Sequence, residues 1–117
     1  MRFLMPLTLV LLLATSGWTA TGGFQGPGSE APVNTVAQAK TAWDDTPVEL
    51  TGHIVRRAAG SHEHYLFRDS TGEIVLDIDD KLFMGRTFTP EMTVRVYGEV
   101  DKELVGTKID VKSFEIQ

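Results

Sequence analysis

Apolar and polar residues alternate along most of this chain after residue 47. From residue 48 to 57 the aliphatic side chains fall on one side, and from residue 73 to 79 they do so again. A period of two is typical of β-strands with one face buried and the other in water. We expect five strands, at residues 48–57, 64–68, 73–79, 93–100 and 105–111.

The residues expected to face the core are aliphatic. Between the third and fourth strands, the apolar cluster within residues 80–85 predicts one helical turn or a packed loop. The predicted core positions are Val48, Leu50 and Ile54, then Ile74, Leu76 and Ile78, then Val94, Val96 and Val100, and finally Val105, Ile109 and Val111.

A short helix is expected before the first strand. Thr35 and Gln38 match a capping box, in which the threonine side chain caps the first turn and the glutamine reaches back. Helical spacing of apolar residues continues to Trp43, which predicts a helix at 36–43 with Trp43 in the core. The helix should end before Pro47, because the residue ahead of a proline disfavours helical angles.

Glycines interrupt the strand pattern at positions 52 and 98. A glycine inside a strand often marks a bulge or sharp bend, and a bent strand can serve both sides of a small barrel. Together with the five strands, these bends predict a mainly β protein. Its expected fold is the OB-fold, a five-stranded Greek-key barrel, with a short N-terminal helix. A two-sheet sandwich is the alternative, although five strands would make a thin one.

The first residues are expected to direct export. Residues 1–20 carry one positive charge, then an apolar run, then small and polar residues, which is the order of a secretory signal peptide. The apolar run has 12 residues, fewer than the roughly 20 of a spanning helix. We therefore expect no stable membrane insertion after cleavage; an uncleaved anchor is the alternative. Residues 21–33 predict a flexible Gly/Pro leader, and 34–117 the folded domain.

Charge and cysteine content exclude several classes of function. Without Arg2 the chain has ten basic residues against 16 acidic ones, a net charge of about −6. Nucleic-acid binders need a basic surface to neutralise phosphates, so nucleic acid is not an expected partner. The lack of cysteine excludes disulfides and thiol chemistry. Together with the signal peptide, it predicts a soluble periplasmic protein.

Catalytic motifs are missing from the sequence. It has no phosphate-binding loop, nucleophile elbow, dinucleotide fingerprint or HExxH motif. The carboxylates of residues 77–80 alternate with apolar residues, as on a solvated strand face. The sequence therefore indicates a protein that is not an enzyme.

Short motifs follow one another along nearly the whole exported chain. They are Gly22-Gly23-Phe24-x-Gly26-Pro27, Thr35-Val36…Ala39, Asp44-Asp45, Val48-x-Leu50-x-Gly52-x-Ile54, Tyr65-x-Phe67-x-Asp69, Gly72-x-Ile74-x-Leu76-x-Ile78-Asp79, Gly98-Glu99-Val100-Asp101 and Ile109-Asp110-Val111. In combination they resemble the bacterial OB-fold (BOF) family, the YgiW/YdeI type of periplasmic protein. The resemblance implies a helix-preceded OB-fold, export to the periplasm, a link to envelope or oxidative stress, and small or sugar-like ligands. It supplies no catalytic residues.

The segment His62-Glu63-His64 is not part of that family pattern. Residues two apart in a strand point the same way, so both imidazoles could reach one metal ion. His53 would lie beside them if the first two strands pair. Zinc or copper would suit imidazole with a carboxylate. A metal-binding stress protein using His53, His62 and His64 is therefore the alternative hypothesis, against a simple solvated loop; no other cofactor is expected.

The expected binding surface follows from the fold. OB-folds bind oligomers across strands two and three and the loops between strands one and two and strands four and five. The expected partner is a small molecule or a glycan such as peptidoglycan; an adaptor that contacts an envelope protein is a further hypothesis. The predicted ligand-binding residues are Arg57, His64, Leu66, Arg68, Asp77 and Lys102, with Ser61, His62 and Val75 beside them.

Overall fold

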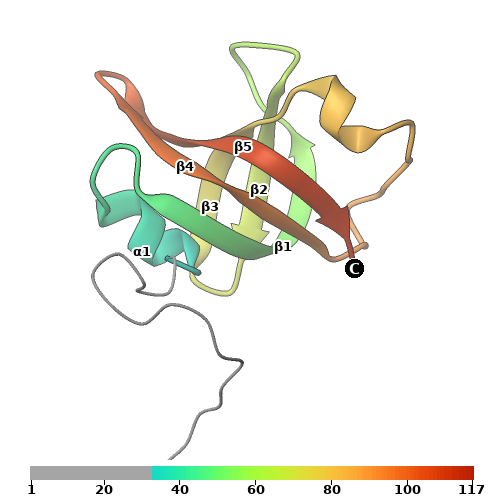
Figure 1. Ribbon diagram of the computed structural model, residues 1–117, viewed down its shortest axis with the longest axis horizontal. Coiled ribbons are helices and arrows are strands. Elements are labelled where there is room, and N and C mark those ends of the chain that lie inside the picture. The colour runs from blue at the N-terminus through green and yellow to red at the C-terminus, as the bar shows by residue number, and fades with distance from the viewer. Residues whose placement is uncertain (1–32) are drawn as a thin grey trace, which may run out of the picture. The chain divides into compact units, whose positions relative to one another are not determined.

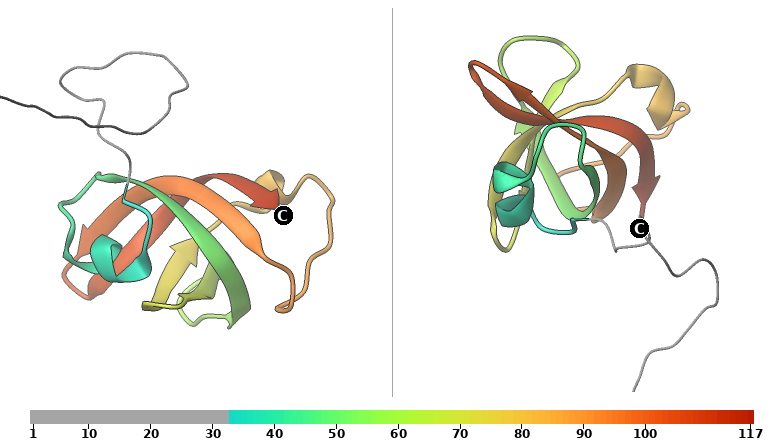
Figure 2. Two further views of the ribbon diagram at one scale, coloured as in Figure 1. Left: turned by 90° about the horizontal axis from the view of Figure 1, so that it is seen from below. Right: turned by 60° about the vertical axis from the view of Figure 1, so that its left-hand side comes forward.

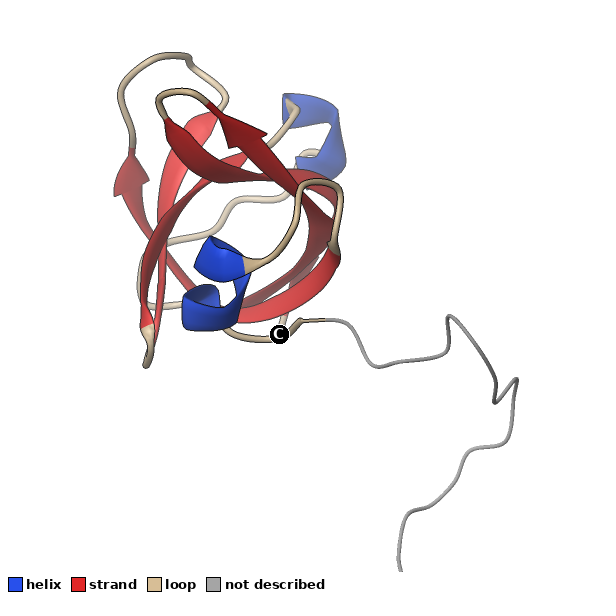
Figure 3. Ribbon diagram, turned by 90° about the vertical axis from the view of Figure 1, so that its left-hand side faces the viewer, coloured by secondary structure: helices blue, strands red, loops and turns tan. Residues whose placement is uncertain are grey.

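The computed structural model describes residues 33–117. They form a closed barrel of five strands in the order β1-β2-β3-β5-β4, with a short helix before the first strand (Figures 1, 2 and 3). The predicted mainly β barrel with an N-terminal helix is confirmed. The elements are α1 (Val36–Thr41), β1 (Pro47–Arg57), β2 (His64–Asp69), β3 (Gly72–Asp77), the 3-10 helix η1 (Asp80–Phe83), β4 (Val94–Glu103) and β5 (Gly106–Ile116).

The predicted signal peptide and most of the predicted leader lie outside the described residues. Val33, expected as the last leader residue, forms a parallel β-bridge with Val48. The backbone amide of Glu49 donates to the carbonyl oxygen of Val33 at 2.8 Å. Within residues 33–117, no helix has the length and apolar character needed to span a membrane.

β1 closes the barrel because it pairs with two strands in succession. Residues 47–52 pair with β4 and residues 53–57 pair with β2, both antiparallel. Gly52 is the last residue before the partner changes, and a Cβ atom there would overlap the carbonyl oxygen of Arg68. The bend predicted at this glycine is therefore confirmed.

Gly98 allows a similarly close backbone contact on β4. The pairing of β4 with β5 shifts register between Tyr97 and Gly98, and a Cβ atom at Gly98 would overlap the carbonyl oxygen of Asp110. A bulge increases the local twist and lets the strand curve round the barrel. The bend predicted here is also confirmed.

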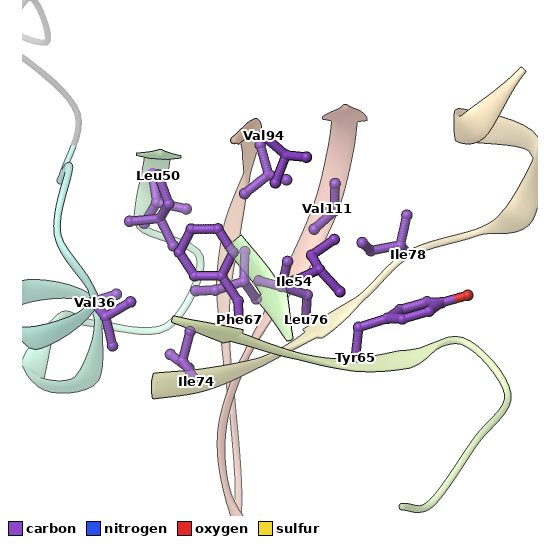
Figure 4. Packing of buried hydrophobic residues seen from close by; sticks show 14 of the residues in the cluster. Val36, Leu50, Ile54, Tyr65, Phe67, Ile74, Leu76, Ile78, Val94 and Val111 are labelled. Carbon is purple, nitrogen blue, oxygen red and sulfur yellow. The ribbon is translucent and has the colours of Figure 1, made fainter. Parts of the chain in front are cut away.

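The barrel encloses one apolar core (Figure 4). Ile54, Ile74, Val96 and Ile109 come from four strands, and each is at most 4% exposed. Within residues 33–117 the buried set contains no polar or charged residue. Burying one large aliphatic or aromatic side chain contributes about 1.5–3 kcal/mol. This core therefore stabilises a chain that has no disulfide.

Caps and long-range hydrogen bonds hold α1 on the barrel. The amide of Gln38 donates to Thr35 Oγ1 at 3.2 Å, and the Gln38 side chain accepts from the amide of Asn34 at 3.2 Å. The Asp69 carboxylate, at the end of β2, accepts from the amide of Val36 at 2.9 Å. The helix therefore starts where the capping box predicts.

The helix ends earlier than predicted, and the prediction that Trp43 is a core residue is wrong. Ala42 is already extended, and Asp45 has a left-handed φ of 67°. The amide of Asp45 donates to the carbonyl oxygen of Val100 at 2.7 Å. The backbone after α1 therefore runs toward β4 and no longer continues the helix. Trp43 lies in this segment, and its side chain is 87% exposed.

The β4–β5 hairpin is longer than predicted. Residues 101–103, expected in a loop, pair with residues 106–108. Only Leu104 and Val105 form the turn, and both are exposed. The prediction that Val105 faces the core is therefore wrong. Backbone pairing extends both strands past the core, so the two residues of the turn are left in water.

Of the two alternatives predicted between the third and fourth strands, a helical turn or a packed loop, the structure has a helical turn, η1. Asp79 caps it by accepting a hydrogen bond from the amide of Lys81 at 2.9 Å. The ring of Phe83 packs against Tyr65 and Phe114 with ring centroids 5.8 Å and 5.1 Å apart. η1 therefore adds an aromatic layer to the core.

Candidate functional site

The outer face of β2 and β3 is the surface on which the sequence predicts ligand binding. Outward side chains on these strands alternate with core residues and meet in pairs across the two strands. The structure therefore places four predicted site residues, His64, Leu66, Arg68 and Asp77, along one face. The outward pairs are His64 with Asp77, Leu66 with Val75, and Arg68 with Glu73.

A hollow of about 320 Å³ opens at one end of this face. It lies between the β1–β2 loop and the tip of the β4–β5 hairpin, which project at the same end of the barrel (Figure 2). Val75 lines it from β3, and residues 59–60 and 105–107 complete its rim. His64, Glu103 and Lys108 supply its ionisable side chains. We call this site the loop hollow.

His64 connects the loop to the strand face. Its Nδ1 lies 3.0 Å from the carbonyl oxygen of Ala59, and its Nε2 lies 3.8 Å from Asp77 Oδ2. Its backbone carbonyl accepts from the amide of Ala58 at 2.9 Å, and its amide donates to Ser61 O at 3.1 Å. These contacts hold the β1–β2 loop over the face and fix one wall of the loop hollow.

Lys108 lies on the opposite wall and is already paired. Its Nζ lies 2.9 Å from Glu103 Oε2 and 3.1 Å from Asp101 Oδ2, and its side chain is 14% exposed. The hydrogen bond to Glu103, with the contribution of Asp101, outweighs partial burial and raises the pKa of Lys108 above its usual value. This wall therefore carries one cation and two carboxylates.

Arg68 lies at the other end of the face. Its Nε donates to Glu73 Oε2 at 2.7 Å, so its charge is also paired. It lines a separate polar groove of about 430 Å³, together with Thr51 and His53 of β1. Arg68 and Leu66 are not among the lining residues of the loop hollow.

The side chains of Arg57 and Lys102 also lie outside the loop hollow. The Arg57 guanidinium lies over the Tyr65 ring, 5.1 Å from its centroid. Lys102 Nζ donates to the carbonyl oxygen of Lys40 at 3.1 Å. Neighbouring residues of a strand point to opposite faces, so Lys102 turns toward α1 while Glu103 turns toward the hollow.

The structure does not bring the three histidines together. His53 pairs with Arg68, four residues along β2 from His64, a separation of about 13 Å at the usual rise per residue. Its Nδ1 lies 3.1 Å from the carbonyl oxygen of Pro90. His62 lies before β2, where the same-face rule for strands does not apply, and its side chain is 77% exposed. Within residues 33–117, no three His, Asp or Glu side chains are arranged to hold a metal ion.

Three polar residues of the loop hollow were not predicted from the sequence: Glu103, Thr107 and Lys108. They follow from the length of the β4–β5 hairpin, which pairs Asp101 with Lys108 and Lys102 with Thr107. The sequence signal that could have revealed them is the pair of opposite charges, Asp101 and Lys108, on either side of a short turn, because such pairs stabilise neighbouring strands.

Comparison with known sequences matches this chain to one protein family and to two of its relatives. A family profile described as "Bacterial OB fold (BOF) protein" matches residues 14–116. The calcium-regulated OB-fold protein CarO of Pseudomonas aeruginosa is 43% identical over 98 residues, which cover 84% of this chain and 83% of CarO. Protein YgiW of Escherichia coli K12 is 48% identical over 102 residues, with 78% of this chain and 77% of YgiW covered.

Comparison with solved structures also finds similar proteins. The structure of the hypothetical protein YgiW from E. coli matches with a TM-score of 0.69 at 44% identity, covering 83% of this chain and 100% of that chain. A chain of the S. pombe Stn1–Ten1 complex matches with a TM-score of 0.53 at 13% identity, covering 76% of this chain and 79% of that chain. At such low identity, the second likeness shows the fold alone.

Proposed function

Because this chain belongs to the bacterial OB-fold (BOF) family, we propose that it is a non-catalytic protein that binds a small or sugar-like ligand of the bacterial envelope. The binding site is the loop hollow with the adjoining end of the outer face of β2 and β3, around His64 and Val75. OB-folds bind oligomers across this surface and its two flanking loops. The observation that carries the proposal is the 320 Å³ hollow between those loops, a size typical of small-ligand sites.

The side chains of the loop hollow fit a ligand rich in hydroxyl groups. His64, Glu103 and Thr107 offer hydrogen-bond donors and acceptors, and Val75 offers an apolar surface between them. A sugar ring presents both kinds of surface, with hydroxyl groups around its edge and C–H groups on its face. Peptidoglycan is therefore the envelope polymer chosen for the test.

The charges around the site argue against nucleic acid as the ligand. Lys108 is paired with two carboxylates, and Arg68 is paired with Glu73. The whole chain has a net charge of −5. Binding of nucleic acid relies on lysines and arginines that neutralise several phosphates, so the proposal excludes nucleic acid as the ligand.

The proposed place of action is the periplasm, with a role in stress tolerance. Residues 1–20 have the order of a signal peptide. The relative CarO is described as calcium-regulated, and this supports a role that depends on external conditions. The names of CarO and YgiW do not describe enzymes, and this supports a binding role without a chemical step.

Retention on purified, insoluble peptidoglycan tests the proposal. The variant Val75→Gln places a longer, neutral side chain in the loop hollow and His64→Ala removes one wall, so the double variant should lose most of the retention. Arg68→Ala, at the other end of the same face, is the matched control and should be retained like the unchanged protein. Thermal unfolding of all three proteins establishes that each is folded.

Two results would reject the proposal in different ways. Equal retention of the double variant and the unchanged protein would remove the loop hollow as the site. Failure of every form of the protein to be retained would remove peptidoglycan as the ligand.

A further inference from the structure

A second hollow, of about 210 Å³, lies at the end of β1. It is enclosed by residues 54–57 of β1, Tyr65 of β2 and residues 88–90 of the segment between η1 and β4. It shares no lining residue with the loop hollow. We call it the arginine hollow, after Arg56 and Arg57 at its rim.

The inner wall of the arginine hollow is apolar and firmly packed. Tyr65 is 5% exposed, and its ring packs edge-on against Phe83. Phe88 lies against Phe83 and Phe114, with ring centroids 5.0 Å apart in both pairs. Ile54 and Tyr65 both extend from this wall into the core (Figure 4). The hollow therefore offers a preformed apolar surface to a ligand.

The rim carries two arginines whose partners are carbonyl groups. Arg56 Nη1 donates to the carbonyl oxygen of Arg57 at 2.9 Å, and Arg57 Nη1 donates to that of His62 at 2.6 Å. In residues 33–117, ion pairs within 4 Å join Arg68 and Arg95 to carboxylates, but none involves Arg56 or Arg57. A guanidinium has five N–H donors. Most donors of both arginines therefore remain for a ligand, on a chain that is acidic as a whole.

We propose that the arginine hollow binds a small anion, a carboxylate or phosphate monoester carried on a single apolar ring. The ring packs against Phe88 and Pro90, beside Arg57, whose guanidinium already lies over the Tyr65 ring. The anionic group accepts paired, charge-assisted hydrogen bonds from Arg56 or Arg57, because the planar guanidinium matches carboxylate and phosphate geometry.

Size and charge set the limits of this ligand. The hollow is smaller than the roughly 300–1,000 Å³ of sites for drug-sized molecules, which restricts it to one ring. Its two arginines favour an anion, whereas two carboxylates surround Lys108 beside the loop hollow. The two sites should therefore take different ligands, and this inference does not depend on the function proposed above.

NMR titration of the ¹⁵N-labelled protein tests the inference, with phenyl phosphate and benzoate as probes and benzyl alcohol as the neutral control. The amides of residues 54–57 and Thr89 should shift and saturate at millimolar concentrations of either anion. Benzyl alcohol should bind at least about tenfold more weakly, because it lacks the charge. The double variant Arg56→Gln, Arg57→Gln should weaken anion binding by at least about tenfold. Arg68→Gln, on the β2–β3 face, is the matched control and should leave anion binding unchanged.

Any of three results would overturn the inference. The first is equal affinity for benzyl alcohol and phenyl phosphate, which would make the site a plain apolar pocket. The second is unchanged anion affinity in the folded double variant. The third is the lack of saturable shifts around the arginine hollow at up to about 10 mM anion, a concentration that would detect even weak binding.

Discussion

At the scale of single residues, two glycines let the barrel close. At positions 52 and 98 a backbone carbonyl of a neighbouring strand occupies the space that a Cβ atom would need. Neither glycine has a positive φ, so the requirement is for space and not for unusual backbone angles. The glycines therefore permit the close strand contacts that bring β1 to β2 and β4 to β5.

Substitution of Gly98 by alanine is expected to destabilise the protein. The added methyl group must displace the backbone of Asp110, and overpacking of this kind costs about 1–3 kcal/mol. Urea unfolding followed by circular dichroism measures the change in free energy. Ser113→Ala, an exposed position on the facing strand, should change it by less than about 0.5 kcal/mol. Equal unfolding midpoints for the two variants would contradict this account.

At the scale of elements, the turn between β2 and β3 holds α1 in place. The helix has six residues, too few to be stable alone. Asp69 accepts hydrogen bonds from the amides of Val36 and Thr71 at 2.9 Å and 2.7 Å, and from the Thr71 hydroxyl at 2.6 Å. Partial burial opposes the charge, but these bonds outweigh it and lower the pKa of Asp69 below its usual value.

The variant Asp69→Asn should lose stability in a pH-dependent way. A carboxyl group with a lowered pKa in the folded state stabilises the protein above its unfolded pKa of about 3.9, and this contribution disappears as the pH falls through the folded value. We expect a loss of about 1–3 kcal/mol at pH 7, shrinking as the pH falls from about 5 to 2. Urea unfolding at several pH values measures it. A loss of the same size at every pH would show that the charge of Asp69 is not involved.

At the scale of the whole molecule, one core of apolar residues holds all the elements together. It includes Val36 and Ala39 of α1 and residues from each of the five strands. Phe67 is the largest side chain that is fully buried. Removing part of this core should therefore weaken the entire barrel and not one strand.

The variant Phe67→Ala is expected to lower the free energy of unfolding by about 3–5 kcal/mol. Small domains have only about 5–15 kcal/mol in total, so this variant should unfold at much lower urea concentration. Phe67→Leu keeps most of the apolar volume and should cost much less. Near-ultraviolet circular dichroism, which reports the packing of the buried Tyr65, and far-ultraviolet circular dichroism should show one common transition. Separate transitions would contradict a single core.

Strand alternation predicted the fold well, because the side-chain period of a strand reports which face is buried. The same rule placed His64, Leu66 and Arg68 on one face. Periodicity was wrong for Val105, expected inside from strand alternation, and for Trp43, expected inside from helical spacing, since apolar character does not reveal whether another element covers a residue. Both are exposed, because the chain pairs with β4 after α1 and because the β4–β5 hairpin projects beyond the barrel.

The sequence by itself determined the number of strands and their approximate positions along the chain, the capped start of the helix and most of the aliphatic core, since each depends on residues close together in the chain. Only the tertiary structure decided which side chains share a site. Register between β1 and β2 separates His53 from His64, and the length of the β4–β5 hairpin brings Glu103 and Lys108 into the same hollow. The loop hollow and the arginine hollow each combine residues from distant segments. Local periodicity carries no information about such contacts, because they depend on how strands pair and where loops return.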